Sequence, residues 1–199
     1  DAMALNGGAD SIGGPSGSLG SVTIQPVTLA RPIEIGVPSG DGPATSLSLN
    51  DAEILALRNG LSRITIGRSN GTGAVDVQSA NFNDAVNILS GASGTIDING
   101  AVTTNDNDLL LFSGGAMTLA NDITTGAGVV RLRSGAGIDQ TSGSISSGAL
   151  GVRSAGDVTL LSATNVFDIF AASDSASGSF VNVISEITHP VFIGTVSAS

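Results

Sequence analysis

The run Asn105-Asp106-Asn107-Asp108 gathers carboxylate and carboxamide oxygens in one short segment. Oxygen donors of this kind are the ligands that Ca²⁺ takes in proteins. The run lacks the spacing and the closing glutamate of the helix–loop–helix calcium motif. A solvated turn is therefore the favoured interpretation. A structural calcium ion bound by Asp106 and Asp108 is the alternative, and the sequence indicates no other cofactor.

A second pattern is an apolar β-branched residue followed by two hydroxyls, which recurs at offsets of 21 and 22 residues. An outward array of threonines on a flat β surface can order water, as in some ice-binding proteins. Three rungs, one of them built from serine, make a small and imperfect array. Threonine favours strands, and serine and threonine both favour turns, so we interpret the pairs as scaffolding and keep an ice-binding module as an alternative. The pairs are Thr103 and Thr104, Thr124 and Thr125, and Ser146 and Ser147.

Catalytic chemistry has little support in the residue pattern. Arg133 and Arg153 are expected to stack on one wall of a repeat fold, but no group of aspartates converges beside them. His189, the only histidine, precedes Pro190 and matches no nucleophile by spacing. No phosphate-binding loop or dinucleotide fingerprint is present. We expect no enzyme here, and keep a β-helical polysaccharide-active enzyme as an alternative.

Composition excludes several classes of function. The 199 residues carry a net charge of −10, which would repel a nucleic-acid backbone. The seven basic residues are all arginine and there is no cysteine, so disulfides are excluded. No apolar run approaches the roughly 18–20 residues of a membrane span. The first residues, D-A-M-A-L-N-G-G, lack the features of a signal peptide.

Triplets that begin with an apolar residue recur in three series at one period, the third series being the apolar residue followed by two hydroxyls. The first series advances in steps of 20 to 23 residues, the second in steps of 20 or 21, and the third in steps of 21 or 22. Agreement among three independent series predicts one structural unit per period. The series begin at Ile64, Val86, Leu109, Val130 and Leu150; at Val75, Ile96, Met117, Ile138 and Val158; and at Val102, Ile123, Ile145 and Val166.

Each triplet alternates with period two, which is typical of a short strand with one buried face. Glycine, serine, asparagine and aspartate separate the triplets and favour turns. Three strands and their turns fit a coil of about 21 residues, whereas a propeller blade needs about 40. The prediction is an all-β fold, a right-handed parallel β-helix in which coils stack; the handedness follows the general preference for right-handed crossovers.

One segment breaks the period. Residues 50–60, N-D-A-E-I-L-A-L-R-N-G, carry helix-start residues and a terminal glycine, so they predict one short inserted helix. We therefore expect a single β-helical segment over 1–199. It divides into an irregular N-terminal coil with the helix (1–60), regular coils (61–166) and an irregular C-terminal coil (167–199).

The segments S-L-S-L-N-D-A-E-I-L-A-L and S-R-I-T-I-G-R-S-N-G-T-G-A-V-D-V precede repeated units such as S-G-G-A-M-T-L and S-A-G-D-V-T-L. Over residues 20–165 this pattern resembles filamentous-haemagglutinin-like exoproteins, large bacterial proteins of which many are exported by two-partner secretion. The resemblance implies a long right-handed β-helical shaft in an adhesin, a surface fibre or the carrier of a distal effector. It also implies an extracellular or cell-surface location.

The function expected from these observations is therefore structural. Stacked coils would hold binding loops away from a cell, and unpaired strands at the ends would need continuation. The expected partners are neighbouring β-helical coils or identical subunits joined end to end, and a glycan or protein of a cell surface. No nucleic acid and no membrane span are expected.

Overall fold

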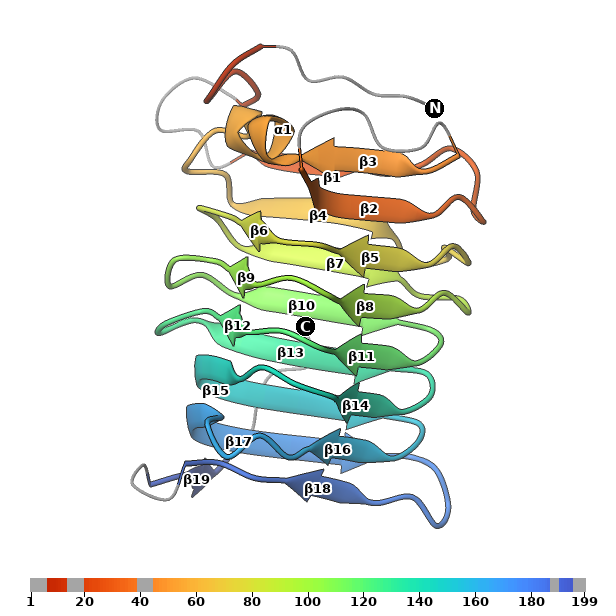
Figure 1. The fold of residues 1–199 in the computed structure, drawn as a ribbon, viewed down its shortest axis with the longest axis vertical. Coiled ribbons are helices and arrows are strands. Elements are labelled where there is room, and N and C mark those ends of the chain that lie inside the picture. The colour runs from red at the N-terminus through yellow and green to blue at the C-terminus, as the bar shows by residue number, and fades with distance from the viewer. Residues whose placement is uncertain (1–6, 14–19, 39–44, 187–189, 195–199) are drawn as a thin grey trace.

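The computed structural model describes residues 7–13, 20–38, 45–186 and 190–194. They form a parallel β-solenoid of about six turns with a spacing of about 21 residues per coil. Viewed along the axis from the N-terminal end, the chain winds clockwise as it moves toward the C-terminal end (Figure 1). The solenoid is therefore right-handed. The predicted fold class is confirmed. His189 lies outside the described residues.

The first wall of the solenoid carries the longer strands of each coil. Adjacent strands are parallel and keep their register across the wall. In axial order it contains β1 (Ser21–Ile24), β4 (Arg63–Arg68), β7 (Val86–Ser90), β10 (Leu109–Ser113), β13 (Val129–Ser134), the second part of β15 (Ile145–Ser154), β17 (Val166–Asp174) and β19 (Phe192–Ile193).

The second wall is an eight-stranded sheet built mainly from three-residue strands. The third wall is narrow and joins the first at the long strand β15. In axial order the second wall contains β3 (Leu47–Asn50), β2 (Ile33–Val37), β5 (Val75–Val77), β8 (Ile96–Ile98), β11 (Met117–Leu119), β14 (Ile138–Gln140), β16 (Val158–Leu160) and β18 (Val181–Val183). The third wall contains β6 (Ala80–Asn81), β9 (Val102–Thr103), β12 (Ile123–Thr124) and the first residues of β15 and β17.

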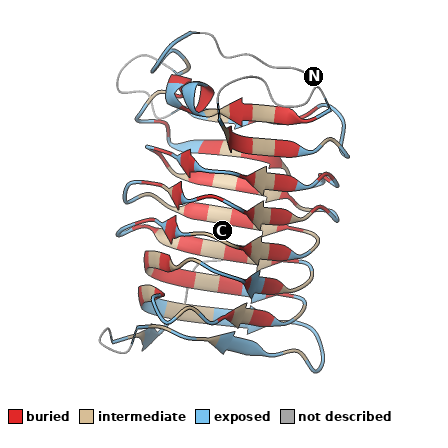
Figure 2. Ribbon diagram, viewed as in Figure 1, coloured by how far each residue is buried: buried red, intermediate tan, exposed pale blue. Residues whose placement is uncertain are grey.

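The first two predicted series are confirmed residue by residue. Ile64, Val86 and Leu109 are register partners along the first wall, and Val75 pairs with Ile96 along the second. Their side chains are buried, and each coil covers the apolar face of the next. Figure 2 shows buried residues recurring along the strands of both walls. Exposure is 0–1% along the second-wall column of Val75, Ile96, Met117, Ile138 and Val158.

The last member of the third series is wrong. Val166 pairs with Ser146, an outward position, so the residue in register after Ile145 is Asn165. Asn165 is fully buried. Its Oδ1 accepts from Gln140 Nε2 at 2.9 Å and from the Ile145 backbone N–H at 2.8 Å, and its Nδ2 donates to Gln140 Oε1 at 2.9 Å. A polar residue occupies the apolar column because the neighbouring coil supplies a complete set of partners.

The inserted helix is shorter than predicted. Helix α1 spans Asp51–Ala56, and Asn50 caps it: Asn50 Oδ1 accepts from Glu53 N–H while Glu53 Oε2 accepts from Asn50 N–H. The helix ends before Gly60 because Leu57 is extended and bridges to Ile12. Ile54 and Leu57 are buried in the core, so α1 covers the N-terminal end of the solenoid (Figure 1).

We predict that Asn165→Ala destabilises the fold by about 1–3 kcal/mol, because it strands the Gln140 amide and the Ile145 N–H in the core. The measurement is the free energy of unfolding in urea. Asn121→Ala, at a turn outside the core, is the matched control and should cost less. The double variant Gln140→Leu/Asn165→Leu should recover much of the loss, since it removes both polar partners. A single variant as mild as the control would contradict this role.

Candidate functional site

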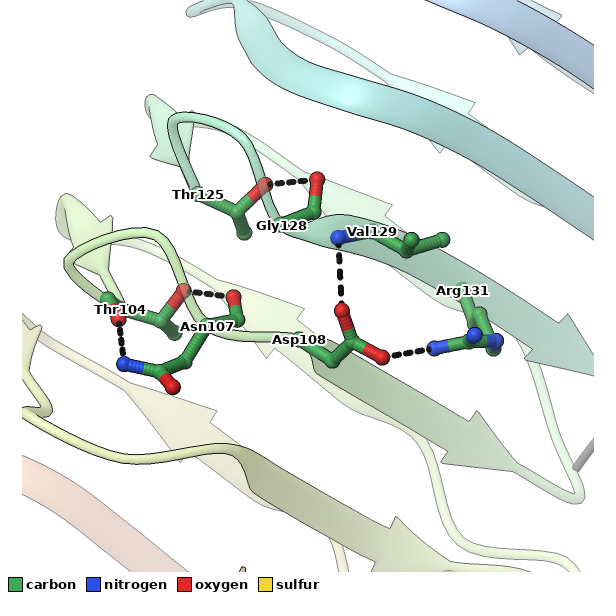
Figure 3. Close-up of polar contacts among 7 residues, drawn as sticks. All are labelled: Thr104, Asn107, Asp108, Thr125, Gly128, Val129 and Arg131. Atoms are coloured by element: carbon green, nitrogen blue, oxygen red, sulfur yellow. Dashed lines mark hydrogen bonds and ion pairs between the residues drawn. The ribbon is translucent and has the colours of Figure 1, made fainter. Parts of the chain in front are cut away.

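The hydroxyl pairs divide between the two faces of the third wall. Thr104 and Thr125 are fully buried, whereas Thr103 is half-buried and Thr124 is exposed on the outer face. Thr125 Oγ1 donates to Gly128 O at 3.0 Å, and Thr104 Oγ1 makes the equivalent bond to Asn107 O (Figure 3). The second hydroxyl of each threonine pair therefore closes the corner turn between the third and first walls.

The serine pair departs from this scheme. Ser147 is buried like the second threonines, but its Oγ has no hydrogen-bond partner in the part of the chain that the structure describes. Its register partner in the next coil is Phe167, which ends the column of inward hydroxyls. Only one outward column remains, namely Thr103, Thr124 and Ser146, so the six predicted residues form no wide hydroxyl surface. Their roles beyond the turns stay a prediction.

Asp106 and Asp108 each bind the coil that follows. Asp106 Oδ1 accepts from Ala127 N–H at 2.9 Å and lies against Gly126, where an added Cβ would collide with the carboxylate. Asp108 Oδ1 accepts from Val129 N–H at 2.9 Å (Figure 3). Both carboxylates thus fix the corner of one coil to the next. Asn105 and Asp106 turn that corner with positive φ angles of 47° and 68°.

The asparagines beside them present donors toward the preceding coil. Asn105 Nδ2 donates to Asn81 Oδ1 at 2.9 Å and to Asn83 Oδ1 at 3.0 Å. Asn107 Nδ2 donates to Asn83 O at 3.0 Å. Among the described residues, no group of three or more Asp, Glu, His or Cys is arranged to hold a metal ion. The run joins three successive coils, and calcium binding by Asp106 and Asp108 stays a prediction.

Asp108 also forms an ion pair. Arg131 Nη1 lies 2.8 Å from Asp108 Oδ2; the arginine side chain is 16% exposed and the aspartate 47%. Burial acts to raise the pKa of Asp108. The hydrogen bonds from Arg131 and Val129, with the charges of Arg131 and Arg63, outweigh it and hold the pKa below its ordinary value of 3.8.

The predicted stacking of Arg133 and Arg153 is confirmed, since they are register partners on β13 and β15. The Arg133 guanidinium carbon lies 4.9 Å from the centroid of the Phe112 ring, a cation–π contact. Sequence reasoning missed Phe112. The signal was available, because Phe112 precedes Arg133 by the same 21 residues that separate their neighbours Leu111 and Leu132.

Two shallow hollows lie on the outside of the solenoid. One, of about 290 Å³, is lined by Phe112, Arg133, Arg153 and the turns that follow their strands. The other, of about 410 Å³, lies between α1 and strands β6 and β9. Neither lining contains a histidine or a cysteine, and Asp51 supplies the carboxylate in the second hollow.

Comparison of the chain with protein-family models, curated proteins and solved structures finds no match. Within the described residues, none of the helical structure is long and apolar enough for a membrane crossing.

We predict that Asp108→Asn lowers the free energy of unfolding at pH 7 by no more than about 1 kcal/mol, because the pair is solvent-screened. The pKa of Asp108 is lower in the folded state than in the unfolded state. The stabilisation from its ionised carboxylate is therefore fully present above the unfolded-state pKa and is lost as the pH falls through the folded-state pKa. The difference from wild type should therefore shrink as the pH falls below 3.8 and vanish only below the folded-state pKa. A double-mutant cycle with Arg131→Met isolates the pair. An equal loss at pH 7 and pH 2 would contradict the ionic contribution.

For the Asn105–Asp108 run, the solvated-turn interpretation predicts that neither Ca²⁺ nor EDTA shifts the Tm measured by circular dichroism. Asp106→Asn is a useful variant because it keeps an oxygen that can accept from Ala127 N–H while removing the charge. A rise in Tm with Ca²⁺ that disappears in Asp106→Asn would establish the calcium site instead.

Proposed function

We propose that this chain is a shaft segment of a large secreted or cell-surface bacterial protein of the adhesin class. Its role would be structural: the stacked coils set the length and stiffness of a rod that carries binding loops. The sequence pattern of the repeats supports this proposal, because it resembles the pattern of filamentous-haemagglutinin-like exoproteins. The observation that carries it is the difference between the two ends of the solenoid.

The N-terminal end is covered. The segment that covers it, which we call the capping segment, is α1 with Leu57 and Arg58. Ile54 and Leu57 of this segment pack into the hydrophobic core. The N-terminal residues pair with the same segment: Ile12 N–H donates to Ala56 O at 2.8 Å, and Arg58 N–H donates to Ile12 O at 2.9 Å. A coil stacked on this end would have to displace α1.

Among the described residues, nothing covers the C-terminal end. Strands β18 and β19 are the last strands of their walls, and apolar side chains there are exposed: Phe192 by 67% and Ile193 by 83%. Phe180 and Ile184, beside β18, are exposed by 49% and 42%. An unpaired strand edge with apolar side chains is a template for another strand. A further parallel coil, stacked on β18 and β19, is the occupant that fits this end.

A test uses the isolated chain, in which a second copy is the only available substitute for a further coil. Two open ends should cover each other, and the covered N-terminal ends should stop this association at two copies. We predict a concentration-dependent doubling of mass in sedimentation velocity at high salt, where an apolar contact persists and contacts between charged groups are screened. Phe192→Ser/Ile193→Ser should abolish it with little effect on folding, since both side chains are largely exposed.

Leu55→Ser is the matched control, because Leu55 is an apolar residue of the covered end with 56% exposure. It should leave the dimer intact. A chain that stays monomeric at all concentrations, or a dimer lost through Leu55→Ser but kept in the Phe192/Ile193 variant, would overturn the proposal that the C-terminal end is built for continuation.

A further inference from the structure

The outer face of the second wall is a narrow acidic ridge. Most of its strands are three residues long, so each presents one residue outward between two buried ones. Register pairing places Glu34 next to Asp76 and Asp76 next to Asp97, with Asp139 two coils further on. We call these four residues the acidic ridge.

The acidic ridge has only neutral hydrogen-bond partners among the described residues. Asp76 accepts from Gln78 Nε2 at 2.5 Å and from Asn99 Nδ2 at 2.8 Å. The other three accept from the hydroxyls of Ser48, Thr95 and Thr159. Glu34, Asp76 and Asp97 stand on adjacent strands, each about one strand spacing, roughly 4.8 Å, from the next, and Asp139 stands two spacings from Asp97. Like charges at that spacing repel, so the ridge favours a cationic partner.

The arginines are concentrated on the other large wall. Five of the seven lie on first-wall strands β4, β13 and β15. Two of these make hydrogen bonds within the chain: Arg68 donates to Pro26 O and Val27 O, and Arg131 donates to Asp108, with which it also forms an ion pair. Arg133 and Arg153 make no ion pair with the described residues. Arg133 rests on Phe112, and Arg153 is exposed. We call Arg133 and Arg153 the arginine pair.

The surroundings of the arginine pair leave room for an acidic group. The hollow of about 290 Å³ in front of the pair is lined mainly by glycine, alanine and serine turns. Asp174, one coil further on, is held by Ser179 Oγ and by Ala176 N–H rather than by an arginine. The Ser179 hydrogen bond, with that of the Ala176 backbone, keeps the pKa of Asp174 below its ordinary value, so this carboxylate is already satisfied.

We propose that the arginine pair is an interface for the acidic ridge of a second copy of this chain, so that two shafts associate side by side. Charge complementarity selects this occupant: within the described residues, one wall of each shaft carries an acidic column that forms no ion pair, and the other carries the guanidinium groups of Arg133 and Arg153, which form none either. The narrow ridge enters the hollow. Asp76 and Asp97 meet Arg133 and Arg153.

Both columns are built from consecutive coils, and this makes the match geometric as well as electrostatic. Asp76 and Asp97 are direct register partners, and so are Arg133 and Arg153. Since one strand spacing separates each pair, both carboxylates can meet a guanidinium at the same time. Guanidinium groups suit this contact, because their planar fork binds a carboxylate through two hydrogen bonds.

The interface is heterologous, because it joins two different faces. A shaft that binds a neighbour through its arginine pair keeps its own acidic ridge free for another copy, so the contact can extend into a lateral array. The net charge of −10 opposes association of two copies, but screening at physiological salt limits this repulsion to about 8 Å. The contact between charged groups should therefore weaken in high salt, unlike the apolar contact between the ends.

The test uses the Phe192→Ser/Ile193→Ser background, which removes end-to-end pairing. An arginine-face variant, Arg133→Gln/Arg153→Gln, keeps its acidic ridge. An acid-face variant, Asp76→Asn/Asp97→Asn, keeps its arginine pair. We expect the background protein to self-associate in sedimentation velocity and to dissociate in high salt. Each face variant alone should bind itself about tenfold more weakly or not at all. An equimolar mixture should form a heterodimer that grows no further.

Arg63→Gln is the matched control for Arg153→Gln, since both arginines are exposed on the first wall and both changes remove one positive charge. The control should leave association unchanged while Arg153→Gln weakens it. A mixture of the two face variants that stays monomeric would overturn the proposal, as would a loss of association equal in the Arg63 and Arg153 variants. Far-UV circular dichroism confirms that each variant folds.

Discussion

Hydrogen bonding between successive coils is the interaction on which the rest of this structure depends. No three-residue strand of the second wall has enough apolar surface or enough backbone partners to be stable alone, so each coil relies on the coils above and below it. Parallel pairing in constant register also stacks equivalent positions, which keeps the second-wall column from Val75 to Val158 uniformly buried. A residue in this fold is therefore defined by its column more than by its immediate neighbours along the chain.

Departures from uniformity occur where a neighbouring coil supplies a specific partner. Asn165 replaces an apolar residue without loss of hydrogen bonding because Gln140 and Ile145 lie within reach. Asp106 and Asp108 act similarly at the corner, where each receives a backbone N–H from the next coil. Polar residues thus strengthen the joints between coils, and the core gains directional contacts that apolar packing does not provide.

The outward columns are free of these packing demands, so they are where interaction chemistry accumulates. Columns repeat at the strand spacing, and charges placed on adjacent coils form arrays rather than isolated groups. The acidic ridge and the arginine pair on different walls are one result. The open C-terminal end is a different kind of surface, apolar and with unpaired strand edges. The two proposed associations would be independent of each other, one along the axis of the solenoid and one across it.

The sequence by itself determined the all-β class, the period of about 21 residues, two complete inward columns, the cap of α1 and the stacking of Arg133 on Arg153, because these follow from local alternation repeated at a constant offset. It could not determine that Asn165 rather than Val166 continues the third column, since one residue of slippage reverses the inward and outward faces and only the pairing with β15 fixes it. The partners of Asp108 and the difference between the two ends were likewise decided by tertiary structure. Each depends on which segments, distant along the chain, stack on one another.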